Sequence, residues 1–537
     1  MTVLLYSIVA SNSLAQNHRK LNMDTLEIVS TSVSVPNTLP LFNIPDGEPA
    51  RDLEGDALGV AFCKENSPQS RRPEGITLTP QFVVERMVEE VVRRNPDVQR
   101  VVDCGAGTGR FSIAAAKAFP NAQIIAVECN VKLAALLQEN LTLSGFADRV
   151  TIVRQDFRSV ALPPIAGRTL YIGNPPYVRH HEISPAWKSW YQEMMKAMGV
   201  KASQLAGLHL HFFAKAIACS RPGDLVFFIT AAEWLETKYG KSLRELILAK
   251  ASKSEITVVN ARVPIFEDAM TTSTLTLVEV GKPNDIVAIR QVETLAALQH
   301  PNGFARFDTS ACQIADRWTD LLRPPDEAIR LSNSIQLGDV LSVHRGQVTG
   351  MNSVWVSGAY QGPLPGSVCF PAVTCAKDLL SLSIARLENA NGLRRVIDLP
   401  ADLLELDKTE QLEVNEFLKW AKSRLAHEGY IASHRKPWYR VGLRAPAPIV
   451  MTYMARRPPR FVRNVCGARL INVAHGLYPR IPISDDVLDL LVEWLNSNVS
   501  INSGRTYAGG LIKFEPGEVM RLRIPRLESL AKGYNAR

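Results

Sequence analysis

The stretch Val101-Val102-Asp103-Cys104-Gly105-Ala106-Gly107-Thr108-Gly109 decides the fold class of this chain. An apolar run ends in an acidic residue, glycines then occupy every second position, and an amphipathic pattern begins at Arg110. This order is typical of a buried strand, a tight loop and a helix. Glycines let the backbone approach a ligand closely, and a helix start offers free N–H groups. The stretch therefore predicts a ligand-binding loop at a strand end, although the loop alone also fits a dinucleotide.

The residues around this loop alternate between short apolar runs and longer amphipathic segments. Such an alternation predicts a doubly wound α/β sheet, here of seven strands. A further helix is expected after Thr79-Pro80, because Thr79 can cap a helix and Pro80 suits its first turn. The expected strands cover residues 100–104, 123–127, 149–153, 169–173, 225–230, 256–260 and 274–280, and the other helices cover 110–118, 131–144, 208–220 and 240–249.

The 537 residues predict two or three domains, because a typical domain has roughly 150 residues. Residues 1–74 have no clear period and predict an extended arm, whose beginning could be an over-called start. Residues 75–285 hold the α/β pattern, and prolines mark residues 286–335 as a connecting region. Residues 336–537 mix short strand-like runs, turns and two stronger helices, and predict a separate α+β domain; those helices lie near residues 409–427 and 485–498.

Positive charge is concentrated in the C-terminal part of the chain. The formal net charge is +8, and residues 331–537 account for all of it with 26 Lys and Arg against 18 Asp and Glu. The segment 435–480 has ten basic residues and no acidic one, with five Trp, Tyr and Phe residues among them. This composition predicts either a polyanionic partner or a solvated basic face.

The cysteines and the hydropathy exclude two other classes of protein. Eight cysteines are scattered without a CxxC pair or a histidine at zinc-ligand spacing, which is typical of reduced thiols in a cytosolic protein without structural metal. No segment approaches the roughly 20 apolar residues of a membrane span. We therefore expect a cytoplasmic protein with no membrane contact.

Acidic residues follow three consecutive expected strands. Glu128 ends the second strand, where a carboxylate can accept both hydroxyls of a ribose. Asp156 follows the third strand and suits an adenine amino group, while Phe157 suits packing on the adenine ring. Each carboxylate alone is more often a loop cap. Together with Asp103, at spacings of 25 and 28 residues, they favour a nucleoside that carries a positive charge.

The fourth expected strand ends in Asn174-Pro175-Pro176-Tyr177. Two prolines remove two backbone donors and fix the path of the turn, so that its carbonyls face outward. The amide oxygen of Asn174 and the carbonyl of Pro175 can then accept from one planar –NH₂ group, with Tyr177 flat over the ring that bears it. Accepting both N–H bonds frees the nitrogen lone pair to attack an electrophilic methyl group. A turn at this edge of the sheet predicts an active site.

These motifs resemble the gamma-class methyltransferases that act on adenine N6 in DNA within type II restriction–modification systems. The resemblance is strongest over residues 75–280 and looser to the C-terminus, and 174–177 match the catalytic tetrapeptide without departure. Residues 209–213 and 225–234 look like the family's next two motifs. The cofactor loop precedes the catalytic tetrapeptide and the recognition region comes last, which is the order of the gamma class. The residues that the resemblance implies for S-adenosylmethionine are Thr79, Asp103, Gly105, Ala106, Gly107, Glu128, Asp156, Phe157 and Asn174.

Further residues correspond to the family's target-base and DNA contacts. Phe266 falls where the family carries an aromatic that packs against the extruded base, with a core Phe at a loop exit as the alternative. Residues 346–352 resemble the turn that opens the family's recognition domains, and 435–439 and 504–507 resemble later segments of those domains. The DNA-contacting residues implied in this way are Arg435, Lys436, Trp438, Tyr439 and Arg505.

The resemblance implies a monomeric enzyme that binds double-stranded DNA, extrudes an adenine and methylates it without a metal, protecting the site from a cognate endonuclease. N4-cytosine methylation stays open, although that class usually carries Ser in place of Asn174. Methyltransferases of protein glutamine and ribosomal RNA share the tetrapeptide but are usually shorter and lack a basic C-terminal domain. A DNA-binding subunit with a relic fold would have a broken cofactor loop, and this loop is intact. No acidic–ExK cluster of a fused nuclease is visible.

Overall fold

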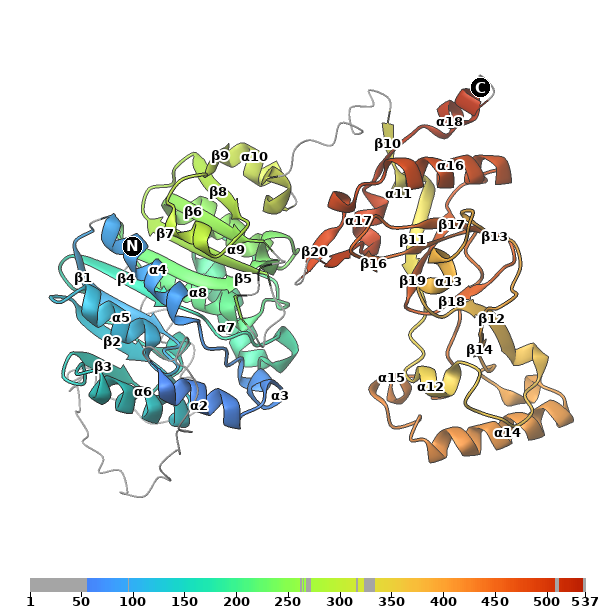
Figure 1. Cartoon of the computed structure of the whole chain (residues 1–537), viewed down its shortest axis with the longest axis horizontal. Helices are drawn as coiled ribbons and strands as arrows, with labels where there is room; N and C mark the ends of the chain where they lie inside the picture. The colour runs from blue at the N-terminus through green and yellow to red at the C-terminus, as the bar shows by residue number, and fades with distance from the viewer. Residues whose placement is uncertain are drawn as a thin grey trace. The chain divides into compact units, whose positions relative to one another are not determined.

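The computed structural model describes residues 56–534 apart from 95, 261–262, 264, 267–271, 315–316, 323–333 and 508–510. The chain divides into two units after Leu322, and each is described here by itself. Figure 1 draws the first from blue to yellow-green and the second from yellow to red. Among the described residues, no helix combines the length and the apolar character that a membrane crossing requires.

The first unit is built on one nine-stranded sheet with the order β3-β2-β1-β4-β5-β7-β6-β8-β9. Strands β1 to β5 are parallel, and β7 runs antiparallel between β5 and β6. The predicted doubly wound sheet is confirmed, and all seven predicted strands are present. The strands are β1 (Val98–Cys104), β2 (Gln123–Val127), β3 (Val150–Val153), β4 (Arg168–Gly173), β5 (Leu225–Ala231), β6 (Ala251–Val259), β7 (Ser273–Val280), β8 (Ile286–Val292) and β9 (Ala305–Asp308).

Helices cover both faces of this sheet because both faces are apolar. Alternate strand residues point to opposite sides, so Val101 and Leu170 lie in one core cluster while Val102 and Tyr171 lie in the other. The first cluster includes residues of α4 (Gln81–Arg93), α5 (Arg110–Ala118) and α6 (Val131–Leu143). The second includes residues of α7 (Pro185–Ala197), α8 (Leu208–Cys219) and α9 (Lys241–Lys250). These layers are visible in Figure 1.

The described part of the predicted N-terminal arm is folded, which corrects that prediction for residues 56–74. It forms α2 (Ala57–Glu65) and α3 (Pro68–Arg71), and Phe62 packs against Leu133 and Leu136 of α6. Residues 1–55 lie outside the described part of the chain. The next helix, α4, begins one residue later than expected, with Pro80 at its N-cap and no side-chain cap. The Thr79 hydroxyl therefore does not cap it; the Thr79 carbonyl accepts from Arg110 instead.

The prediction of a connecting region over residues 286–335 is wrong for residues 286–322. Strand β8 pairs with β6 and β9 pairs with β8, because Val287 and Ile289 of β8 bury their side chains in the core. After β9 come α10 (Thr309–Ile314) and a turn of 3₁₀ helix, Trp318–Leu322, whose Trp318 is fully buried. The sheet therefore continues two strands beyond the seven that were expected.

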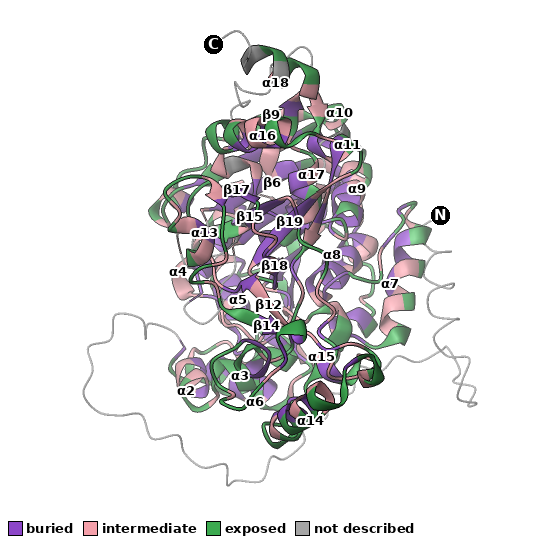
Figure 2. Cartoon of the chain, turned by 90° about the vertical axis from the view of Figure 1, so that its right-hand side faces the viewer, coloured by how far each residue is buried: buried purple, intermediate pink, exposed green. Residues whose placement is uncertain are grey.

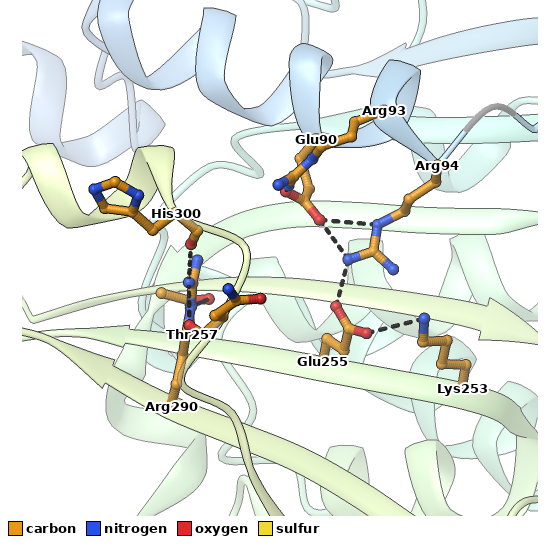
Figure 3. Close-up of polar contacts among 9 residues, drawn as sticks. Glu90, Arg93, Arg94, Lys253, Glu255, Thr257, Arg290 and His300 are labelled. Atoms are coloured by element: carbon orange, nitrogen blue, oxygen red, sulfur yellow. Dashed lines mark hydrogen bonds and ion pairs between the residues drawn. The ribbon is translucent and has the colours of Figure 1, made fainter.

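Polar contacts join β6 to the end of α4 and to the added strand β8 (Figure 3). The Arg94 guanidinium at the end of α4 donates to both Glu90 and Glu255, which lies on β6. Arg290 of β8 donates to the Thr257 hydroxyl at 2.9 Å and to the carbonyl of His300. Because these residues pair with one another, we assign the cluster a structural role.

The second unit is an α+β domain, as predicted. Its main sheet has the order β11-β19-β15-β17-β13, and its inner strands are almost wholly buried, as the purple of β15, β17 and β19 in Figure 2 shows. The two helices predicted from the sequence are α14 (Lys408–Ser423) and α16 (Asp485–Asn498). The strands are β10 (Ser334–Gln336), β11 (Leu341–Arg345), β12 (Cys369–Val373), β13 (Arg386–Leu387), β14 (Arg395–Ile397), β15 (Ile449–Thr452), β16 (Met454–Ala455), β17 (Phe461–Asn464), β18 (Arg469–Leu470), β19 (Ala474–Pro479), β20 (Arg505–Tyr507), β21 (Leu511–Lys513) and β22 (Arg523–Pro525). The shorter helices are α11 (Leu337–Val340), α12 (Asn352–Trp355), α13 (Lys377–Leu380), α15 (Tyr430–Ser433), α17 (Pro516–Met520) and α18 (Leu527–Tyr534).

Candidate active site

The glycine loop and the proline turn lie next to each other at the carboxyl edge of the sheet. They follow β1 and β4, which are adjacent parallel strands. A Cβ atom at Gly105 would lie 3.7 Å from both Pro176 Cδ and Phe212 Cε1. The two motifs, some 70 residues apart in the sequence, therefore form one site in the first unit.

The glycine loop folds back toward the end of β2. Gly105, Gly107 and Gly109 have φ values of +81°, +58° and +95°, which residues with a side chain rarely adopt. The N–H groups of Gly105 and Ala106 both donate to the Val127 carbonyl, at 3.0 and 2.9 Å. This path places the backbone of the loop at the carboxyl edge of the sheet, beside the acidic residues that follow β1 and β2.

Asp103 is fully buried beneath this loop. Its Oδ2 accepts from the Ser112 hydroxyl at 2.7 Å, whereas its Oδ1 has no hydrogen-bond partner among the described residues. Burial raises the pKa of this carboxyl to about 7, against the Ser112 hydrogen bond, which lowers it. Asp103 thus holds one buried oxygen available to a donor.

The Glu128 carboxylate forms hydrogen bonds with backbone N–H groups of the glycine loop and of the residues that follow β2. The carboxylate accepts from the Gly107 N–H at 2.8 Å and from the Asn130 N–H at 2.7 Å. Burial raises its pKa, and these backbone hydrogen bonds act in the opposite direction. Each oxygen keeps a lone pair for a further donor such as a hydroxyl.

Asp156 and Phe157 have partners that the sequence did not suggest. The Asp156 carboxylate pairs with Arg158 at 2.6 Å, and the Arg158 guanidinium lies 3.9 Å from the centre of the Trp187 ring. Phe157 is buried, and its ring centre lies 5.3 Å from that of Phe212. Phe157 therefore occupies a core position, and the contacts of both residues with adenine stay predictions.

The proline turn, residues 174–177, is held by hydrogen bonds to the segment that precedes α4. Asn174 Nδ2 donates to the Thr77 carbonyl at 3.1 Å, and the Tyr177 N–H donates to the Gly75 carbonyl at 3.3 Å. Because its Nδ2 is engaged in this way, the orientation of the Asn174 amide is set. Asn174 Oδ1 is buried and has no hydrogen-bond partner within the described part of the chain. The turn thus offers an oriented amide oxygen.

Aromatic rings surround Tyr177. Its ring centre lies 6.2 Å from that of Phe266, at an interplanar angle of 69°, and 6.1 Å from that of His209. Phe266 is 4% exposed and packs in the core, which agrees with the alternative of a core residue, and its contact with an extruded base stays a prediction. The Tyr177 hydroxyl is buried without a partner among described residues, and burial raises its pKa.

Two residues of the site were missed by the sequence analysis. Asp56 accepts from the Gly59 N–H at 2.7 Å, from Arg110 Nε at 2.7 Å and from Asn140 Nδ2 at 2.8 Å, as well as from the Thr108 hydroxyl. It therefore ties α2 to the glycine loop, and its signal was a helix-capping Asp before an apolar run. The other residue is His209, which the sequence analysis placed in the motif-like run 209–213 without assigning it a role; its signal was a histidine within an otherwise apolar helix.

The segment around Thr79 lies against the glycine loop. Thr79 is 4% exposed, and its carbonyl accepts from Arg110 Nη1 at 2.7 Å. Its neighbour Leu78 is closer to the loop, since a Cβ atom at Gly107 would lie 3.4 Å from Leu78 Cδ2. The predicted contact of Thr79 with a cofactor stays a prediction.

In the second unit, most of the predicted DNA-contacting residues are bound to their own unit. Arg435 donates to the carbonyls of Val348 and Thr349, within the 346–352 turn. The Trp438 ring packs 6.1 Å from that of Trp355, and the Tyr439 hydroxyl donates to the Ala401 carbonyl at 3.0 Å. Lys436 is exposed, and the side chain of Arg505 lies outside the described residues.

Profiles of known families match both units. Residues 170–266 match the family described as Eco57I restriction-modification methylase, and residues 317–536 match the C-terminal domain of the type II methyltransferase M.Eco57I. Residues 74–188 also match the TRM5/TYW2 methyltransferase domain. The restriction–modification profiles therefore cover the proline turn and nearly all of the second unit.

Individual relatives extend this similarity over most of the chain. The chain is 46% identical over 456 residues to the type II methyltransferase M.XamI of Xanthomonas campestris pv. amaranthicola, across 85% of this chain and 86% of that protein. It is 22% identical to the type II methyltransferase M.AccI of Acinetobacter calcoaceticus, across 65% and 67% of the two chains. The type IIL restriction–modification enzyme MmeI, solved in complex with DNA, has the same fold with a TM-score of 0.56 at 11% identity, across 86% of this chain and 70% of that chain.

Proposed function

The chain belongs to the type II DNA methyltransferases of restriction–modification systems, and from this we propose that it transfers a methyl group from S-adenosylmethionine to the N6 amine of adenine. The adenine lies in a specific double-stranded DNA sequence. The observation that carries the proposal is the orientation of the Asn174 amide.

The amide nitrogen of Asn174 already makes a hydrogen bond within the protein, whereas its amide oxygen is available to a ligand. Nδ2 donates to the Thr77 carbonyl, while the buried Oδ1 has no partner among the described residues. A buried acceptor without a partner costs about 1–3 kcal/mol, so its retention is expected where a substrate supplies the donor. The exocyclic amine of a base is such a donor, with two hydrogens in one plane.

The carboxylates of the site suit the cofactor that methyl transfer requires. S-adenosylmethionine supplies an electrophilic methyl group carried on a sulfonium. Asp103 Oδ1 is a buried carboxylate oxygen without a partner among the described residues, and it suits a charged amine of this molecule. Glu128 suits its ribose hydroxyls, and Asp156 would accept from its adenine by sharing a carboxylate that now pairs with Arg158.

The catalytic turn would activate the target amine by position and by hydrogen bonding. Asn174 Oδ1 and the Pro175 carbonyl accept one N6 hydrogen each, which turns the nitrogen lone pair out of conjugation with the ring. The Tyr177 ring supports the base, with Phe266 beside it. No side chain of the turn is a strong base, so the proton leaves to solvent after transfer. Holding the amine in line supplies most of the acceleration.

The basic second unit would bind the DNA. The N6 amine is paired inside the duplex, so the target adenine leaves the stack to reach the turn. Phosphate contacts supply most of the affinity, and exposed side chains such as Lys436 and Arg440 are suited to them. We infer a monomer in the bacterial cytoplasm that protects its site from a cognate endonuclease.

The proposal is tested by incubating the purified protein with tritium-labelled S-adenosylmethionine and unmethylated bacterial DNA, then separating the nucleosides. We expect label in N6-methyladenine, and none with the Asn174→Ala variant. Label in N4-methylcytosine would replace the target base but keep the mechanism. Label in added protein or RNA with none in DNA would refute a DNA substrate.

A further inference from the structure

His209, at the start of α8, is a buried histidine whose two ring nitrogens both lack a partner. The residue is 6% exposed, and neither Nδ1 nor Nε2 has a hydrogen bond to any described residue. Leaving a buried polar atom unpaired costs about 1–3 kcal/mol, and a histidine here gains nothing over Phe or Leu for packing alone. The two unpaired nitrogens therefore indicate that a bound ligand supplies a hydrogen-bond partner to His209.

The position of His209 points to the catalytic turn. Its ring centre lies 6.1 Å from that of Tyr177, the residue that would support the target base. The N–H of Leu208 donates to the carbonyl of Val178 at 3.0 Å, which fastens the start of α8 to the residue after the turn. A Cβ atom at Gly207 would come within 3.0 Å of His209 Cε1, so the glycine leaves room for the ring.

The catalytic turn lacks one kind of group that an adenine needs. Asn174 Oδ1 and the Pro175 carbonyl are acceptors and suit only the N6 amine. The ring nitrogens on either side of this amine, N1 and N7, are acceptors and need a donor. Burial lowers the pKa of His209 to about 4, so the imidazole is neutral near pH 7 and always carries one N–H.

We propose that His209 binds the extruded base directly, its imidazole N–H donating to the ring nitrogen N1 or N7 beside the N6 amine. This proposal rests on the proposed adenine methylation. The contact holds the base in the plane that presents its amine to Asn174. The contact would also make His209 a determinant of specificity, because it requires a base with an acceptor nitrogen beside the amine.

The neighbouring His211 provides a matched control. It lies on the same helix, is 1% exposed and has a pKa lowered to about 3 by burial. Its ring, however, stacks on Tyr191 of α7, with ring centres 4.2 Å apart at an interplanar angle of 7°. A change at His211 therefore removes a buried histidine from α8 without removing the proposed base contact.

The test compares His209→Phe, His209→Asn and His211→Phe in single-turnover methylation of a duplex that contains the recognition site. The site is first read from the positions that the wild type modifies in plasmid DNA. For His209→Phe we expect the rate constant to fall about 10–100-fold, because a hydrogen bond is lost and an acceptor on the base is left unpaired. The affinity for S-adenosylmethionine, followed by protein fluorescence, should stay within a factor of two. His209→Asn keeps a donor and should recover part of the rate, and His211→Phe should retain nearly all of it.

Base analogues identify the atom. In duplexes with 1-deazaadenine or 7-deazaadenine at the target position, one ring nitrogen becomes a C–H. With the analogue that lacks the bound nitrogen, the wild type should be as slow as His209→Phe, and the variant should lose no further rate. Equal wild-type rates on adenine and both analogues would overturn the proposal. Loss of cofactor affinity in His209→Phe would also overturn it, by assigning the residue to the cofactor. Absence of adenine methylation by the wild type would instead overturn the proposed function.

Discussion

The carboxyl edge of the first unit's sheet and the buried Arg463 in the basic segment of the second unit, residues 435–480, differ in how their polar atoms are paired. At the carboxyl edge, buried polar atoms of Asp103, Asn174, Tyr177 and His209 have no partner among the described residues. In the basic segment, Arg463 is almost fully buried, yet its Nε, Nη1 and Nη2 donate to Asp489, Pro448 and Asp485. Unpaired groups reduce the stability of a fold, and paired groups maintain it.

We infer that this difference separates the residues proposed to perform chemistry from a residue that stabilises the fold. A buried group without a partner is retained at a cost in stability when a substrate or cofactor supplies the partner. Changes at the carboxyl edge should therefore reduce activity without reducing stability. A change at the buried Arg463 should do the reverse, although both regions contain residues that the sequence assigned to function.

The largest effect is expected for Asn174→Ala. We expect kcat to fall by about 10²–10³-fold, as when one polarising group of an active site is removed. The melting temperature should change little, because the hydrogen bond lost to Thr77 is offset by removal of the unpaired oxygen. Steady-state methylation and thermal unfolding measure the two quantities. Asn66→Ala is the control, since Asn66 also donates to a backbone carbonyl, that of Phe62 at 2.9 Å, outside the site. A large fall in stability for Asn174→Ala would remove the distinction between the two regions.

The next effect concerns Asp103 and pH. Because burial raises its pKa to about 7, the carboxyl is neutral in weak acid and ionised above neutrality. The affinity for S-adenosylmethionine should therefore rise between pH 6 and pH 8, and Asp103→Asn should abolish this rise and weaken binding at pH 8 by about 10–100-fold. Isothermal titration across this range measures it, with the exposed Asp97→Asn, at the opposite end of β1, as control. An unchanged pH profile in Asp103→Asn would exclude the carboxyl from cofactor binding.

Whereas cofactor affinity should rise with pH, the contribution of Asp103 to the stability of the fold should fall with pH. Its pKa is raised in the folded state, so folding favours the protonated form. The stability that this group contributes is present below its unfolded pKa of about 4 and is lost as the pH rises toward about 7. Asp103→Asn should therefore be more stable than the wild type at pH 8, as urea unfolding would show.

A smaller effect, on stability alone, is expected for Arg463→Ala. Loss of its hydrogen bonds to Asp485, Asp489 and the Pro448 carbonyl should lower the free energy of unfolding by about 1–3 kcal/mol. Thermal unfolding followed by circular dichroism measures this, and the exposed Arg440→Ala is the control. Unchanged stability together with weakened DNA binding would place Arg463 at the DNA surface and contradict the contrast.

The smallest effect is expected for Lys436→Ala. This exposed side chain would contact a phosphate, so DNA affinity should weaken similarly for all sequences, and the slope of log affinity against log salt should fall by about 1. Fluorescence anisotropy at several salt concentrations measures both, with the exposed Lys408→Ala on α14 as control. An unaltered slope would show that Lys436 does not contact DNA.

The fold of the first unit could be predicted because its apolar runs are long and regular. Helix α5 occupies the residues expected for it, and the seven predicted strands are all present. Strand β9 was missed because an exposed edge strand has few apolar residues to mark it, whereas β8 was missed although its sequence is apolar. Helices α2 and α3 were missed because they are short and gain their stability from tertiary contacts, such as that of Phe62 with α6.

Part of the candidate site could be predicted because its motifs are contiguous. The stretch 103–109 and the turn 174–177 each carry their chemistry in one short segment. Asp56 and His209 were missed because their roles depend on contacts with residues far away in the sequence, such as Asn140 for Asp56 and Tyr177 for His209. Arg435 and Tyr439 carry groups suited to DNA, but only the structure reveals that both groups bind carbonyls of their own unit.

Adenine methylation at the carboxyl edge is tested most directly by expressing the chain in a bacterial host that lacks its own DNA methyltransferases. Single-molecule sequencing of the host DNA then reads the modified bases and their positions. We expect N6-methyladenine at nearly every copy of one short sequence, with none in cells that express Asn174→Ala. Unmodified DNA in cells that contain the folded protein would contradict adenine methylation by this site, as would an N6-methyladenine pattern that Asn174→Ala leaves intact.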